Sequence, residues 1–153
     1  MLVHGDSVEG TFDIYFEKLA GYLRIPKKDD NKDEIDYLMI SDKEKALVGS
    51  KKKCFPNSIQ LLCHEHQKEN LAANCVYDSN SVKFKMVMTI VMVDMAGADS
   101  KEDFQKAKAE ILSDFDDAFP GNYFETFSKT LWECEVEPRL RFPKVIPKNA
   151  KTN

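Results

Sequence analysis

The sequence has 153 residues, of which 42% are hydrophobic and 31% charged, and its formal net charge is −4. This length is enough for one domain with a hydrophobic core, and the composition excludes a disordered chain. The small acidic excess does not indicate a general nucleic-acid-binding surface, which usually carries a clear excess of lysine and arginine.

The first half of the chain alternates between helix and strand patterns. Apolar residues recur at helical spacing from Thr11 to Leu23. Ile35 to Ser41 has the nearly continuous apolar character of a buried parallel strand, and a helix is expected from Lys43 to Lys52. A second strand, Ser58 to Cys63, leads into a helix from Glu65 to about Val76. This alternation favours an α/β fold with a parallel pair of strands.

The second half of the chain predicts mainly helices. Val82 to Ala96 is strongly apolar, but its period does not distinguish a strand from a helix. Ser100 begins a predicted helix as its N-cap, and Tyr123 to Trp132 is a further amphipathic helix. From Glu137 to Asn153 the chain is rich in proline and basic residues, which indicates a loop or tail. The apolar stripe expected on the Ser100 helix consists of Phe104, Ala107, Ile111, Leu112 and Phe115.

The cysteines and the apolar segments indicate in which cellular compartment we expect the protein. The four cysteines have no paired spacing, and the N-terminus has no signal-peptide pattern. We therefore expect a reducing compartment, nuclear or cytoplasmic, and no secretion. The run from Met86 to Ala96 is shorter than the roughly 20 residues of a membrane span, and Asp94 interrupts it, so we expect no membrane partner.

Asp42 follows the strand predicted at Ile35 to Ser41. Open α/β sheets place ligands at the carboxyl ends of their strands, and carboxylates are the usual protein ligands of Mg²⁺ and Mn²⁺. The alternative role is that of an N-cap for the helix that begins at Lys43, and for an isolated residue this role is the more frequent one.

Cys63 and His66 form a C-x2-H pair at the end of the next predicted strand. Such a pair can supply two of the four ligands of a zinc site, with Cys54 and Cys75 as the nearby candidates for the others. Their spacing matches no standard zinc pattern. The structural alternative makes Cys63 a buried strand-end residue and His66 a polar residue of the first helical turn.

In this order, the motifs resemble the transposases of Mutator-like elements (MULE), a branch of the RNase H-like DDE recombinases. ISDKEKAL supplies the family's second Asp as Asp42, and LLCHEHQKEN supplies its CxxH motif as Cys63 and His66. FPNSIQ, and the opening MLVHGDSVEGTFDIYFEKLAGYL, are also similar to the family. The resemblance implies a partial RNase H-like sheet, with strands near 1–4, 35–41 and 58–63. It further implies a core at 1–76, a helical insertion at 77–136 and a Pro-rich basic tail at 137–153.

The resemblance also implies a chemistry. In the family, two Mg²⁺ or Mn²⁺ ions held by an Asp-Asp-Glu set activate a water or a 3′-hydroxyl for attack on a DNA phosphodiester. Asp42 would be a catalytic metal ligand, and Cys63 and His66 would shape the active site around it. DNA would be the partner, and the nucleus the place of DNA transposition.

The chain departs from the family at two of the three carboxylates. Neither the first Asp nor the distal Glu has a match, so we expect an internal fragment of the catalytic domain that is inactive as this chain. We also expect a marginally stable protein, because the strand at 35–41 would expose an apolar edge. Four glutamates remain as substitutes for the distal Glu, although none lies in a matching motif: Glu125, Glu133, Glu135 and Glu137.

A different function stays open, that of a domesticated protein-interaction module derived from a transposase. The helices at Ser100 to Phe119 and Tyr123 to Trp132 would then present an apolar face to a protein partner or to a second copy. An aromatic stripe of this kind is more often part of a core. Its members are Phe104, Phe115, Phe119, Phe124, Phe127 and Trp132.

Overall fold

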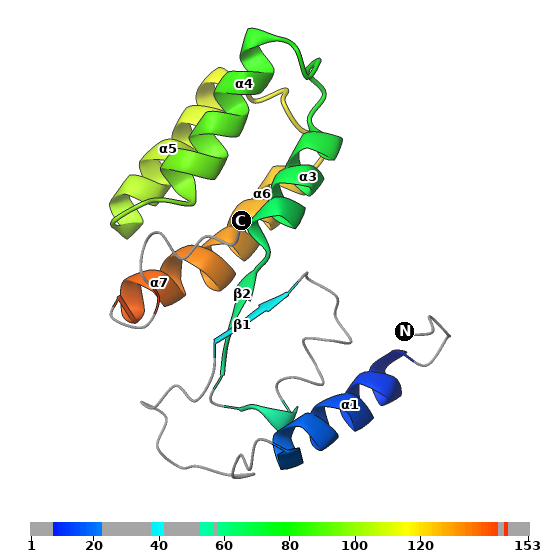
Figure 1. The fold of residues 1–153 in the computed structure, drawn as a ribbon. Helices are drawn as coiled ribbons and strands as arrows, with labels where there is room; N and C mark the ends of the chain where they lie inside the picture. The colour runs from blue at the N-terminus through cyan, green and yellow to red at the C-terminus, as the bar shows by residue number, and fades with distance from the viewer. Residues whose placement is uncertain (1–7, 23–37, 42–52, 57, 144–145, 147–153) are drawn as a thin grey trace. The chain divides into compact units, whose positions relative to one another are not determined.

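The computed structural model describes residues 8–22, 38–41, 53–56, 58–143 and 146 (Figure 1). The chain divides into two compact units, Met1–Leu61 and Leu62–Asn153. The boundary that the sequence predicts between residues 76 and 77 stays a prediction. No helix in the described part of the chain is long and apolar enough to cross a membrane.

The first unit is organised by two aromatic side chains. α1 (Val8–Tyr22) carries Phe16, whose ring meets the ring of Phe55 edge to face, with 5.7 Å between the ring centroids. Both side chains are buried. An ion pair of 2.8 Å between Lys53 Nζ and Asp13 Oδ2 links the same two segments. The predicted helix at Thr11 to Leu23 is therefore confirmed, and it begins earlier than expected.

Two strands form a small parallel sheet, β1 (Leu38–Ser41) and β2 (Ile59–Leu62). Each lies inside a predicted strand, at 35–41 and 58–63, so these two predictions are confirmed. The coarse α/β assignment holds for a molecule that is mostly helical. The strand expected at residues 1–4 and the helix expected at 43–52 lie outside the described residues.

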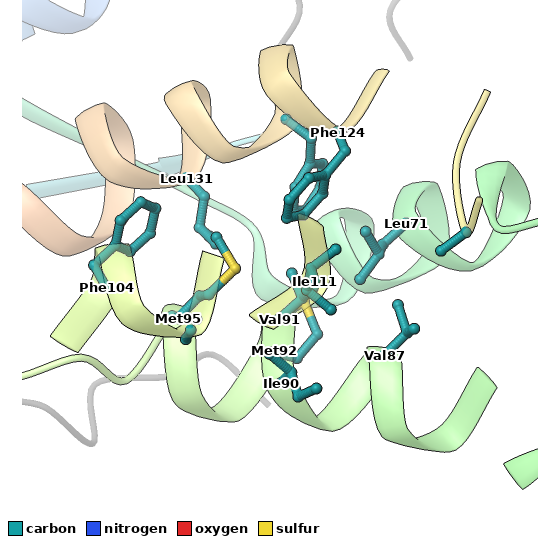
Figure 2. Packing of buried hydrophobic residues seen from close by; sticks show 14 of the residues in the cluster. Leu71, Val87, Ile90, Val91, Met92, Met95, Phe104, Ile111, Phe124 and Leu131 are labelled. Atoms are coloured by element: carbon teal, nitrogen blue, oxygen red, sulfur yellow. The ribbon is translucent and has the colours of Figure 1, made fainter. Parts of the chain in front are cut away.

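The second unit is a helical assembly around one hydrophobic core. In Figure 2, side chains from several helices converge on one another, with Leu71, Val91, Ile111 and Leu131 among them. The elements are α3 (His64–Asn74), α4 (Val82–Thr89), η1 (Ile90–Met95), α5 (Lys101–Asp114), α6 (Tyr123–Leu131), η2 (Trp132–Val136) and α7 (Glu137–Arg141).

The segment of ambiguous period, 82–96, is helical. α4 continues into η1, a π-helical stretch in which the Ala96 amide donates to the carbonyl of Val91 at 3.0 Å. The i→i+5 bonds of a π-helix make its turn wider than that of an α-helix. Val91, Met92 and Met95 face the core, whereas Met86 and Val93 are exposed. Apolar residues therefore lie on both sides of this helix, which is why the sequence shows no clear period.

α5 has the predicted start and most of the predicted stripe. Ser100 Oγ accepts a hydrogen bond from the Asp103 amide at 3.0 Å, which confirms the N-cap. Leu112 is wrong as a core residue: it is 51% exposed, because it follows the buried Ile111 by one residue and so points away from the core. The aromatic stripe lies in the core, which is its more frequent role. Five of its side chains are buried and Trp132 packs partly against the same core.

The prediction of a loop or tail from Glu137 onward is wrong for residues 137–141, which form α7. Pro138 lies at the start of α7, directly after η2, and its missing amide hydrogen removes one hydrogen bond from this junction. The buried Arg139 explains why this segment is ordered. Its Nη2 atom donates to the carbonyl of Ala96 at 3.1 Å and to that of Ala98 at 2.6 Å, at the end of η1.

We expect Arg139→Met to lower the free energy of unfolding of the second unit by about 2–4 kcal/mol, because two buried carbonyls lose charged donors. Urea denaturation followed by the fluorescence of Trp132, the single tryptophan, measures this change. Arg141→Met is the matched control on the same helix. Arg141 is exposed and lies over the Phe142 ring, so its loss costs at most about 1 kcal/mol. Equal effects of the two substitutions would contradict the role of Arg139.

Two hydrogen bonds join the segment after α3 to the turn after α5. The Val76 amide donates to the carbonyl of Ala118 at 2.9 Å, and the Tyr77 hydroxyl donates to the Asp117 carboxylate. This hydrogen bond raises the pKa of Tyr77 to about 12, while burial raises that of Tyr123 to about 12.

We expect Asp117→Asn to return the pKa of Tyr77 toward its ordinary value, and Asp116→Asn to change it less, since Asp116 acts only through space. Because the folded state favours the neutral phenol, this contribution to stability is present below pH 10 and is lost as the pH rises through about 12. Tyrosinate absorbance against pH measures the shift. An unchanged titration curve in Asp117→Asn would refute the assignment.

Candidate functional site

The junction between β2 and α3 is the candidate site, because it carries the C-x2-H pair. Leu61 and Leu62 are buried at the end of the strand. Cys63 then keeps an extended backbone as the N-cap of α3, and its carbonyl accepts the Gln67 amide at 3.0 Å. Gln67 and Leu71, one turn apart, are the buried side chains of α3. They orient the helix and so determine which residues of its first turn face solvent.

The two residues of the pair have different surroundings. Cys63 is half-buried, and His66 is exposed because it precedes the buried Gln67 by one residue. The structure therefore confirms the strand-end position of Cys63 and the first-turn position of His66, whereas Cys63 is only half-buried and not buried as the structural alternative expects. The third site residue, Asp42, lies outside the described residues, although β1 ends at Ser41, directly before it in the sequence.

His64 is the residue of this motif that the sequence did not single out. Its Nδ1 atom lies 3.8 Å from Oε1 of Glu135 in η2, and their side chains are only 18% and 14% exposed. The pair is ionic when His64 is protonated. Of the other substitute glutamates, Glu125 pairs with Lys108 at 2.6 Å and Glu133 with Lys129 at 3.9 Å. The separation of 71 positions between His64 and Glu135 leaves no local signal of this contact.

The zinc alternative can be tested against the same geometry. Across the residues that the structure describes, no group of three or more His, Cys, Asp or Glu side chains is arranged to hold a metal ion. Cys54, Cys63, Cys75 and Cys134 are half-buried thiols. Cys63, His66 and Cys75 of the hypothetical zinc site are all described and lie in the second unit, and they do not form such a group.

Comparison of the chain with protein-family models, with curated proteins and with solved structures gave no match.

We expect the protein, purified without chelator, to contain well under one equivalent of zinc, because its described cysteines and histidines do not converge. Elemental analysis by mass spectrometry measures the metal content. Cys63→Ser and His66→Ala should leave the content unchanged, as should Cys134→Ser, a control outside the hypothetical site. One equivalent of zinc that is lost in both Cys63→Ser and His66→Ala would contradict this expectation.

Proposed function

We propose that this chain derives from the catalytic core of a Mutator-like DNA transposase and that it does not cleave DNA by itself. The proposal starts from the sequence resemblance around Asp42, Cys63 and His66. Two local features support it. One strand ends directly before Asp42, and a parallel neighbour ends directly before Cys63, which begins a helix.

The observation that carries the proposal furthest is the contact of Glu135 with His64. A DDE site needs a carboxylate from a late segment of the chain beside the strand-end motifs. Glu135 supplies one, 3.8 Å from the histidine that directly follows Cys63. Glu135 is the substitute glutamate that contacts this motif, whereas the family's own distal Glu would lie in the downstream Ala-Glu-Ser-like segment.

The same residues also explain why we propose an inactive chain. Two-metal chemistry requires several carboxylates that hold both ions around the attacking and leaving oxygens. The first Asp of the set has no match in this sequence. The described residues, with one carboxylate beside one imidazole, do not amount to a metal site. In an intact family member, Asp42 would bind Mg²⁺ or Mn²⁺, and Cys63 and His66 would shape the site.

Sequencing the transcript and the genomic DNA on both sides of this reading frame tests the derivation. We expect an upstream strand that ends on an Asp and a downstream Ala-Glu-Ser-like helix start, either in frame or as a decayed remnant. Flanks that encode neither, in any reading frame, would refute the proposal.

We expect the isolated chain to leave supercoiled plasmid intact in Mn²⁺, because only part of the carboxylate set is present. Gel electrophoresis of the plasmid measures nicking. Asp42→Ala should behave as the parent protein does, as should Asp94→Ala, which changes an exposed carboxylate on η1. Nicking that is abolished by Asp42→Ala and kept in Asp94→Ala would show that the chain is active.

If the protein is an interaction module, the face that binds the partner is not the aromatic stripe. The exposed apolar side chains of the second unit include Val82, Met86 and Val93, all on α4 and η1. A module would use this face, since the aromatic side chains lie in the core.

A further inference from the structure

The solvent-facing side of α4 and η1 is unusually apolar. Val82 is 72% exposed, Met86 47% and Val93 59%, while Val87, Val91 and Met95 on the opposite side are fully buried. Val82, Met86, the exposed Thr89 and Val93 follow one another in steps of four, three and four residues, and Lys83, Lys85 and Asp94 are the other exposed residues of α4 and η1. That spacing is the seam pattern of helices that pack lengthwise against another helix.

Thr89 does not interrupt the apolar character of this seam. Its hydroxyl donates to the carbonyl of Lys85 at 2.8 Å, within its own helix. The polar group is therefore already satisfied and would lose little when water is removed. The seam can be covered without leaving a polar side chain unpaired.

The seam has the same pattern in both directions. Counted in residues along the chain, Val82 and Val93 are equally far from the midpoint of the seam, and so are Met86 and Thr89. A surface with this symmetry is complementary to itself about a two-fold axis across the helix. Val82 would then lie near Val93 of the other copy, and Met86 near its Thr89.

The charges on the helix point to the same partner and the same orientation. Lys83 and Lys85 lie at its N-terminal end and Asp94 at its C-terminal end, with no acidic residue at 82–93 and no basic residue at 86–95. Lys83 Nζ lies 5.3 Å from the centroid of the Tyr77 ring, which leaves the exposed Lys85 as the basic group that flanks the seam. Antiparallel packing brings Lys85 of each copy near Asp94 of the other, whereas parallel packing sets like charges together.

We propose that α4 and η1 form a homodimer interface in which two copies pack antiparallel along Val82, Met86, Thr89 and Val93. The interface is a single helix pair. It buries less surface than the about 1,200 Å² at the lower limit of standard stable complexes, so the dimer is weak and forms at high concentration. The inference does not depend on the transposase proposal, because it rests only on the surface of α4 and η1.

Sedimentation velocity of the full chain at low ionic strength, from low-micromolar to submillimolar concentration, tests the interface. We expect a reversible monomer–dimer equilibrium that Met86→Lys weakens by at least about tenfold, since it places like charges beside the two-fold axis. Leu112→Lys is the matched control: it changes an equally exposed apolar residue on α5 and should leave the equilibrium unchanged. Circular dichroism shows whether both variants are folded.

A charge exchange tests the orientation. Lys85→Glu and Asp94→Lys should each weaken the dimer several-fold. An equimolar mixture of the two variants should associate as strongly as the parent protein, because each new charge then faces its opposite. A mixture that associates no more strongly than each variant does by itself would overturn the antiparallel arrangement. A parent chain that stays monomeric at all concentrations would overturn the interface, also in the case that a different protein covers this face. Equal association of the parent chain and the Met86→Lys variant would overturn it as well.

Discussion

Burial of the apolar side of η1 against α5 is the interaction on which the second unit depends. Val91 and Met95 of η1 and Phe104 and Ile111 of α5 are almost completely removed from solvent. Helices as short as α4 and η1 are marginal in isolation, so their stability comes from this packing rather than from local propensity. Removing water from these side chains is therefore what orders the other helices of the unit around them.

Hydrogen bonds at the end of η1 also depend on the packing of the core. The carbonyls of Ala96 and Ala98 lie where the helix stops and have to find donors outside it. Arg139 supplies them from α7, across 43 and 41 positions of sequence. This contact orders a segment of proline and basic residues as a helix. It also places α7, which continues directly from η2, next to the core.

The candidate site depends on the same packing. α3 contacts α4, and its buried Gln67 and Leu71 orient the first helical turn. η2 is brought in from the other end of the unit, so that Glu135 meets His64 beside the strand end. Two roles thus meet on α4 and η1: their inner side assembles the core, and their outer side carries the seam that we assign to a second copy.

Local patterns of side chains were enough to predict both described strands, the helix that follows Cys63, the Ser100 cap, the strand-end position of Cys63 and the first-turn position of His66. Each depends on residues within one or two turns of one another, so the pattern of side chains contains the information. The helical state of 82–96, the exposure of Leu112, the helix at 137–141 and the contact of Glu135 with His64 could not be predicted from such patterns. The helix at 137–141 and the contact of Glu135 with His64 depend on partners far away in the chain. The hydrogen bonds of Arg139 and the contact of Glu135 with His64 across 71 positions form only when the core brings distant residues together.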